Sequence, residues 1–182
     1  FLLVELGTRK GKPNHVLMPY ANGLYLLADW YRQLWAESLG KAAGGPTPVP
    51  AVGATDQHSQ LQRWMEGAPS HVVAFVELER FSTDITIGDA GLSAWENTHW
   101  LAGQSLGHIL RTEKLATEQA LTEARQPNLT WRISELTPQS LAELMTMWEA
   151  MTAYAGELYG VNTFDQPGVE AGKVIAKGLL GA

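Results

Sequence analysis

His71-Val72-Val73-Ala74-Phe75-Val76-Glu77-Leu78 is the stretch of the chain that most clearly predicts a strand. It is rich in β-branched and aromatic residues, which favour extended structure. Shorter apolar runs predict further strands at residues 15–19, 49–54 and 130–133. Because segments with helical spacing separate these runs, the sequence indicates βαβ units and a largely parallel sheet, which is the α/β class of fold.

Helices are predicted where apolar residues recur every three or four positions. One such pattern runs from Leu24 to Trp35 and should end near Gly40, a residue that suits a helix C-terminus. Thr137 and Pro138 form a cap and a first helical residue for another helix. The helix that follows Thr137 should cover residues 138–155, and further helices are expected at residues 56–67, 101–124 and 168–180.

The domain organisation predicted from these elements is simple. Residues 1–182 should form one domain, with the last two helices, at about 137–182, as a C-terminal helical extension. Residues 79–97 should form a loop with a short strand near 85–87. The opening Phe1-Leu2-Leu3-Val4 has no methionine and the composition of a buried strand, so we expect it to continue from a preceding part of a longer protein.

The composition limits the function classes. The net charge of −6 disfavours nucleic acid and anionic membranes as partners. No apolar run is long enough to span a bilayer, and the start lacks a signal-peptide pattern, so we expect a cytoplasmic protein. There is no cysteine, which excludes disulfides and thiolate metal sites within this chain.

Two segments carry candidate catalytic groups at helix ends. Glu37, in residues 33–41, should lie in the last turn of its helix, where the dipole disfavours a carboxylate. The alternative is an ordinary solvated glutamate. His58, in residues 53–60, should lie in the first turn of a helix that follows a strand, where the positive helix end would lower its pKa. The alternative is a structural histidine that bonds a neighbouring loop.

The third segment is a polar loop leading into a helix of small residues, at 162–173. Lys173 lies in the early turns of that helix, against the preference of the dipole; the alternative is a lysine that merely extends to solvent. No metal site is expected, because the remaining histidines are not at ligand spacing. These are His15, His71, His99 and His108, which we interpret as surface or core residues.

Together these segments resemble the glucose-6-phosphate isomerase family. Phe164-Asp165-Gln166-Pro167-Gly168-Val169-Glu170-Ala171-Gly172-Lys173 is similar to its C-terminal signature. Glu37-Ser38-Leu39-Gly40-Lys41 is similar to its Glu-Ser-x-Gly-Lys block, and Thr55-Asp56-Gln57-His58-Ser59 to its Gln-His block. The resemblance implies the C-terminal sugar-isomerase (SIS) domain, a flavodoxin-like three-layer αβα sandwich around a mostly parallel sheet, with C-terminal helices.

The resemblance also implies an activity and residue roles. The activity is interconversion of glucose 6-phosphate and fructose 6-phosphate through a cis-enediolate, with no metal or organic cofactor. Glu37 corresponds to the base that moves a proton between C2 and C1, and His58 to the residue that helps open the sugar ring. Lys173 corresponds to the active-site lysine, while Gln33 and Gln166 correspond to substrate-contacting glutamines.

The resemblance leaves part of the site unaccounted for. The family's Gly-Gly-Arg motif and its main phosphate-binding loop belong to the N-terminal SIS domain and do not occur in this sequence. We therefore expect this chain to be inactive or nearly so without that domain. The family is a homodimer whose histidine reaches the other subunit's site, so His58 is expected to serve a different site from Glu37. The alternatives are a non-catalytic phosphosugar-binding SIS module and an isomerase of another sugar phosphate.

Overall fold

The computed structural model describes residues 1–41 and 44–181. Over these residues it contains a four-stranded sheet of order β2-β1-β3-β4, in which each neighbouring pair is parallel. The strands are β1 (Asn14–Pro19), β2 (Thr47–Pro50), β3 (His71–Leu78) and β4 (Asn128–Ile133). Val16 lies opposite Val49 on one side and Val73 on the other, so β1 is an interior strand. The predicted parallel sheet is confirmed, although the strand expected at 49–54 is found at Thr47–Pro50.

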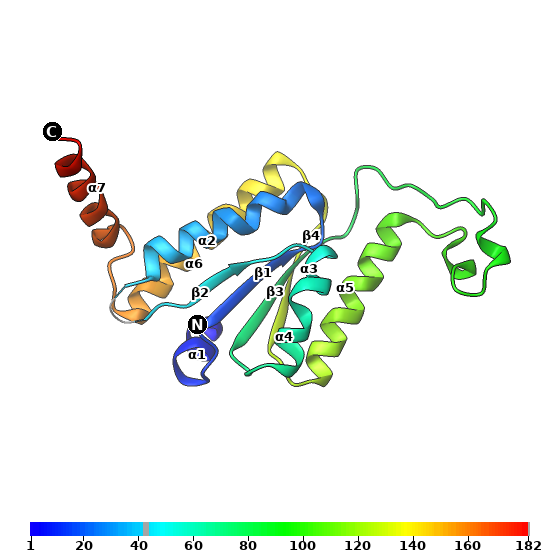
Figure 1. The fold of residues 1–182 in the computed structure, drawn as a ribbon, viewed down its shortest axis with the longest axis horizontal. Helices are drawn as coiled ribbons and strands as arrows, with labels where there is room; N and C mark the ends of the chain where they lie inside the picture. The colour runs from blue at the N-terminus through cyan, green and yellow to red at the C-terminus, as the bar shows by residue number, and fades with distance from the viewer. Residues whose placement is uncertain (42–43, 182) are drawn as a thin grey trace.

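Helices cover both faces of this sheet (Figure 1). On one face α2 (Tyr25–Leu39) packs against α6 (Pro138–Tyr159). On the other lie α3 (Thr55–Ser59), α4 (Leu61–Glu66) and α5 (Leu106–Glu123). The predicted three-layer αβα sandwich is therefore confirmed.

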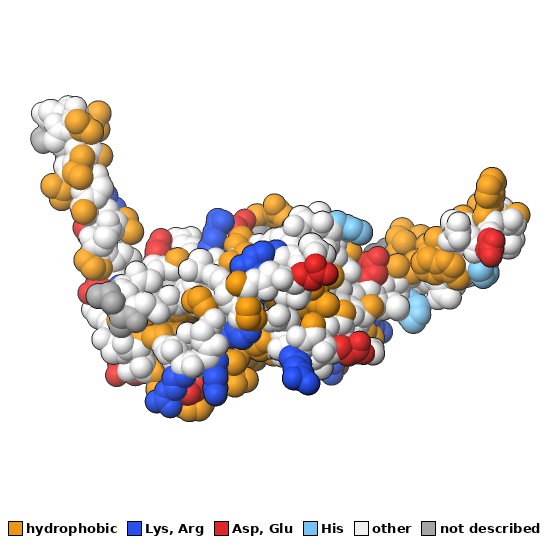
Figure 2. All heavy atoms as spheres, turned by 60° about the horizontal axis from the view of Figure 1, so that its bottom comes forward, with side chains coloured by type: hydrophobic (Ala, Val, Ile, Leu, Met, Phe, Trp, Pro, Cys, Tyr) orange, Lys and Arg blue, Asp and Glu red, His pale blue; other side chains and the backbone are white. Residues whose placement is uncertain are grey.

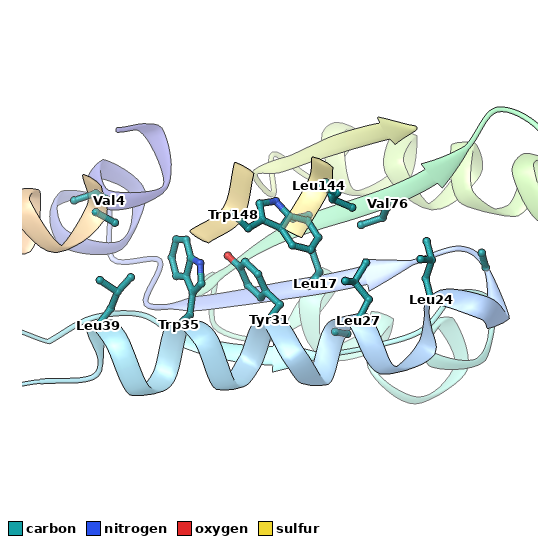
Figure 3. Packing of buried hydrophobic residues seen from close by; sticks show 14 of the residues in the cluster. Val4, Leu17, Leu24, Leu27, Tyr31, Trp35, Leu39, Val76, Leu144 and Trp148 are labelled. Atoms are coloured by element: carbon teal, nitrogen blue, oxygen red, sulfur yellow. The ribbon is translucent and has the colours of Figure 1, made fainter. Parts of the chain in front are cut away.

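The two faces have separate hydrophobic cores because side chains alternate along each strand. Leu17 and Val76 belong to the core under α2 and α6, whereas Val16 and Phe75 belong to the core under α4 and α5. Aromatic rings fill the first core (Figure 3). The Tyr31 ring centroid lies 5.1 Å from that of Trp35 and 5.1 Å from that of Trp148.

A buried lysine lies within the second layer of helices. Lys114 of α5 is 0% exposed, and its Nζ lies 3.2 Å from Glu77 Oε2 and 2.6 Å from Glu118 Oε2. It also donates a hydrogen bond of 2.7 Å to Thr130 Oγ1. A buried ammonium needs such partners, because leaving one charge unpaired in the interior is costly. This network joins α5 to β3 and β4.

The start of the chain corrects one prediction. Phe1–Val4 is not a buried strand: residues 2–9 form α1 (Leu2–Arg9), in which only Val4 is buried. A short apolar run cannot by itself distinguish a strand from one side of a helix. Here Leu, Glu and Arg are good helix formers, and Glu5 pairs with Arg9 at 3.3 Å across one turn.

Two predicted helices have different bounds in the structure. The helix expected at 56–67 is interrupted at Gln60, whose backbone leaves helical geometry at φ −124°, so α3 and α4 are separate short helices. The helix expected from residue 101 begins at Leu106, because the Ser105 side chain caps it by accepting from His108 N. The expected strand near 85–87 is a single bridge between Thr86 and Ser105.

Two segments project from opposite ends of the molecule (Figures 1 and 2). One is the stretch between β3 and α5, which contains η2 (Leu92–Ala94) and η3 (His99–Leu101). The other is α7 (Pro167–Leu179), which has no buried residue. Both carry exposed apolar side chains, among them Trp95, Trp100, Ile175 and Leu179. None of the helices in the described residues is long and apolar enough to cross a bilayer.

Candidate active site

Glu37 lies in the last turn of α2, and its side chain faces outward from the core. Gln33, one turn earlier, donates a hydrogen bond of 3.2 Å from Nε2 to Glu37 Oε1. Residues four apart share a helix face, so the backbone of α2 itself brings the two side chains together. The structure therefore places these two predicted site residues in direct contact.

A hollow of about 390 Å³ lies beside Glu37 and is lined by residues from two distant parts of the chain. The end of α2 contributes Glu37 and the residues just after it. The segment entering α7 contributes Gln166 and the residues that follow. The lining residues are Glu37, Gly40, Lys41, Gln166, Pro167, Gly168 and Val169. The fold therefore brings two of the three candidate segments, and two of the five predicted site residues, to one hollow.

Lys173 is placed near this hollow but not in it. It projects from the second turn of α7, 62% exposed, and its Nζ forms an ion pair of 2.6 Å with Glu170 Oε1. Val169, which does line the hollow, is four residues before Lys173 and so on the same helix face. The ammonium therefore lies one turn further along the face that begins in the hollow.

His58 lies at the other end of the sheet. α2 begins after the carboxyl end of β1 and runs back, so Glu37 lies toward the amino ends of the strands (Figure 1). α3, which holds His58, follows the carboxyl end of β2. The structure does not bring His58 and Glu37 together within one chain.

The expected surroundings of His58 also need correction. The histidine was expected in the first turn of a long helix, but α3 has five residues and His58 is the fourth of them. The carboxylate of Asp56 accepts hydrogen bonds from Val52 N at 2.7 Å and from Ser59 Oγ at 2.5 Å. These bonds join the residues before α3 to its last residue. His58 therefore lies near the end of a five-residue helix, not in the first turn of a helix that continues to residue 67.

A second hollow, of about 530 Å³, lies at the carboxyl ends of the strands. Its polar lining comes from loops that follow β1 and β3 and from α5, namely Asn22, Ser82, Thr83 and Glu113. Open parallel sheets commonly bind ligands at this edge. None of the five predicted site residues lines it, although Gly53 and Ala54 of the candidate segment at 53–60 do. Leu78, Phe81 and Leu106 give it a partly apolar wall.

The other histidines show no arrangement for metal binding. Within residues 1–41 and 44–181, no group of three or more His, Asp or Glu side chains is placed to hold a metal ion. His15 is 3% exposed on β1, with its ring centroid 5.3 Å from that of Trp35. Burial lowers the pKa of His15 to about 4, and contact with the backbone of Lys12 opposes this only in part.

Lys41 and Asp165 were not recognised as site residues from the sequence. Lys41 Nζ lies 3.0 Å from Asp165 Oδ1, which joins the end of α2 to the loop before α7. The signal was present, since a lysine and an aspartate occur inside two of the three candidate segments. Their pairing could not be read from the sequence, because the two residues lie far apart along the chain.

Comparisons with known proteins agree on one family. A sequence model of phosphoglucose isomerase matches residues 98–181. A glucose-6-phosphate isomerase of Rubrobacter xylanophilus is 48% identical over 94% of this chain and 40% of its own length. A probable glucose-6-phosphate isomerase of Methanococcus maripaludis is 42% identical over 97% of this chain and 39% of its own length. The chain thus spans about two fifths of these relatives.

Two solved structures share the fold. A hypothetical protein of Thermus thermophilus superposes with a TM-score of 0.88 at 37% identity, over 100% of this chain and 44% of that one. A glucose-6-phosphate isomerase of Chlamydia trachomatis superposes with a TM-score of 0.82 at 24% identity, over 99% of this chain and 38% of that one. The second likeness is evidence of fold alone.

Proposed function

Because this chain belongs to the phosphoglucose isomerase family, we propose that it supplies one side of the active site of an enzyme that interconverts glucose 6-phosphate and fructose 6-phosphate. The observation that carries the proposal is the hollow beside Glu37, where a carboxylate and the Gln166 segment meet. The likeness of both segments to the family's blocks supports reading this hollow as the sugar site.

In this proposal Glu37 is the base. Aldose–ketose isomerisation requires a group that removes a weakly acidic proton from C2 and returns it to C1, and one carboxylate oxygen that reaches both carbons can do so. Gln33 donates to Oε1 and so limits the rotation of the carboxylate. A positioned acid–base group of this kind contributes about 10²–10⁴-fold to the rate.

Lys173 and Gln166 are proposed to hold the sugar. Gln166 lines the hollow, and Lys173 lies one turn beyond Val169 on the same face of α7. A substrate that extends from the hollow along this face would come within reach of the ammonium. A cation near the ring oxygen favours the charge that develops there during ring opening.

The rest of the site is proposed to come from outside these 182 residues. We propose that this chain is the C-terminal SIS domain, with about 137–182 as its helical extension. An N-terminal SIS domain would supply the arginine and the phosphate-binding loop. We further propose that the enzyme is a cytoplasmic homodimer in which His58 contributes to the active site of the other subunit. The position of His58, at the end of the sheet away from Glu37, supports this. On this reading the chain alone turns over substrate very slowly or not at all.

The test compares Glu37→Gln with Glu149→Gln in the complete enzyme. Glu149 is an exposed glutamate on α6 that does not line the hollow, and it serves as a matched control. Glu37→Gln should reduce exchange of the C2 proton with solvent deuterium by about 10²-fold or more, with hexose phosphate binding retained. Exchange near the wild-type rate would show that Glu37 is not the base. Binding without turnover by the unmodified enzyme would instead favour a non-catalytic phosphosugar-binding module.

A further inference from the structure

Lys41 makes three polar contacts that link the two sides of the hollow. Its Nζ forms the 3.0 Å ion pair with Asp165 Oδ1 and donates to the carbonyl oxygens of Ser38, at 3.1 Å, and of Asn162. The side chain of Lys41 is 15% exposed, whereas that of Asp165 is 53% exposed. An ammonium has three protons to donate, and these three acceptors can use all of them.

The contacts on the α2 side fit the chemistry of a helix end. Carbonyls in the last turn of a helix have no partner further along the helix, and the dipole there attracts a cation. Lys41 follows Gly40, the residue that caps α2, and folds back onto Ser38 O. Glu37 lies directly before Ser38. The ammonium is therefore anchored to the turn that carries the proposed base.

The contacts on the other side fall within a loop that is already ordered by its own hydrogen bonds. Asn162 Nδ2 donates to Asp165 Oδ2 at 2.9 Å, and Phe164 N donates to Asn162 Oδ1 at 3.0 Å. Lys41 thus holds a preformed loop at two points. Gln166 is the next residue after Asp165 and is the N-cap residue of α7.

We propose that Lys41 is a positioning residue that fixes Gln166 and the start of α7 against the turn bearing Glu37. It acts through Asp165 and the Asn162 carbonyl, because these acceptors and Ser38 O can take up all three protons of its ammonium. The proposal rests on the proposed isomerase function for its catalytic consequence, but its structural part stands independently. Misplacing a substrate-holding group by about 1 Å can reduce a rate about 10²-fold, so loss of this link should be visible in kcat.

The structural arm uses the absence of cysteine from the chain. Spin labels at Glu149→Cys on α6 and Ala176→Cys on α7, both exposed positions, report how firmly α7 is held relative to the body. Lys41→Met and Asp165→Asn should each broaden the distance distribution, and Lys41→Arg should keep it close to that of the parent. Lys10→Met, at an exposed lysine after α1, is the matched control and should change nothing.

The kinetic arm uses the complete enzyme. Lys41→Met should lower kcat by about 10- to 100-fold, with a smaller change in KM, and the double variant with Asp165→Asn should be little worse than either single variant. Lys41→Arg should keep most of the parent kcat. The unfolding midpoint of each variant shows whether a loss of kcat comes only from a less stable fold. If the effects of the two substitutions on kcat do not add, both act through the same ion pair between Lys41 and Asp165.

The outcomes separate the two proposals. Unchanged distance distributions and near wild-type kcat in Lys41→Met would overturn the positioning role and leave the isomerase function standing. An unmodified complete enzyme without isomerase activity would overturn the proposed function. The spin-label comparison would still confirm or overturn the link between α2 and the loop.

Discussion

Lowering the pH should destabilise the fold through His15. Burial lowers the pKa of this histidine to about 4, against 6.5 for an exposed one, so the folded state holds it neutral. The unfolded chain takes up a proton as the pH falls through 6.5, whereas the folded chain does so only near 4. The free energy of unfolding therefore keeps its full value, as far as His15 determines it, above pH 6.5. It falls progressively as the pH is lowered to about 4, and His15 causes no further loss below that pH.

The size of the effect follows from the pKa difference. At about 1.4 kcal/mol for each pKa unit, a shift from 6.5 to about 4 corresponds to about 3 kcal/mol of unfolding free energy between neutral pH and pH 4. This is a large share of the roughly 5–15 kcal/mol typical of a folded domain. Since Tyr159 near the ring has its pKa raised by burial, it stays neutral throughout this range.

The assay is urea unfolding of the chain, followed by tryptophan fluorescence, at half-unit steps from about pH 7.5 to 4. His15→Phe removes the titrating group, so the free energy of unfolding of this variant should fall less with acid than that of the parent. The difference between the two losses should be about 3 kcal/mol over this pH range. His108→Phe, at an exposed histidine, should keep the parent slope. If His15→Phe and the parent lost stability in parallel, the assignment of the acid effect to His15 would be refuted.

Other predictions concern the elements that hold the two layers of helices. Lys114→Met removes the ammonium that lies 3.2 Å from the buried Glu77 carboxylate and leaves only Arg111 and Arg132, at 3.9 and 3.6 Å, beside it. The free energy of unfolding at neutral pH should therefore fall by about 3 kcal/mol, the low end for a broken buried pair. Adding Glu77→Gln should recover part of it, and Lys177→Met on exposed α7 should cost nothing measurable. Thr137→Ala removes the side-chain cap that accepts from Ser140 N at 3.0 Å. It should cost about 1 kcal/mol in urea unfolding, and a loss below about 0.3 kcal/mol would contradict the importance of the cap.

Local sequence signals predicted the sheet and the long helices well. β3 spans the residues quoted for it, because a long run of β-branched and aromatic residues has no competing helical interpretation. The start of α6 was also predicted correctly, since Thr137 and Pro138 specify a cap by local chemistry alone. The opening Phe1–Val4 was misjudged because four apolar residues fit either periodicity.

The sequence indicated candidate site residues but not how the fold would arrange them. The meeting of Glu37 with Gln166 depends on α6 returning the chain to the end of α2, which no local pattern encodes. The pairing of Lys41 with Asp165 likewise depends on a tertiary contact. The roles of all five predicted site residues stay predictions. Of these residues, Glu37 and Gln166 line the hollow, whereas Gln33, His58 and Lys173 do not.

The central claim is that the hollow at the end of α2 receives the sugar. A crystal structure of the complete enzyme with an open-chain hexose 6-phosphate analogue tests this directly. The account predicts C1 and C2 of the analogue within hydrogen-bonding reach of the Glu37 carboxylate, with Gln166 beside them. An analogue bound instead in the hollow at the carboxyl ends of the strands, away from Glu37, would contradict it.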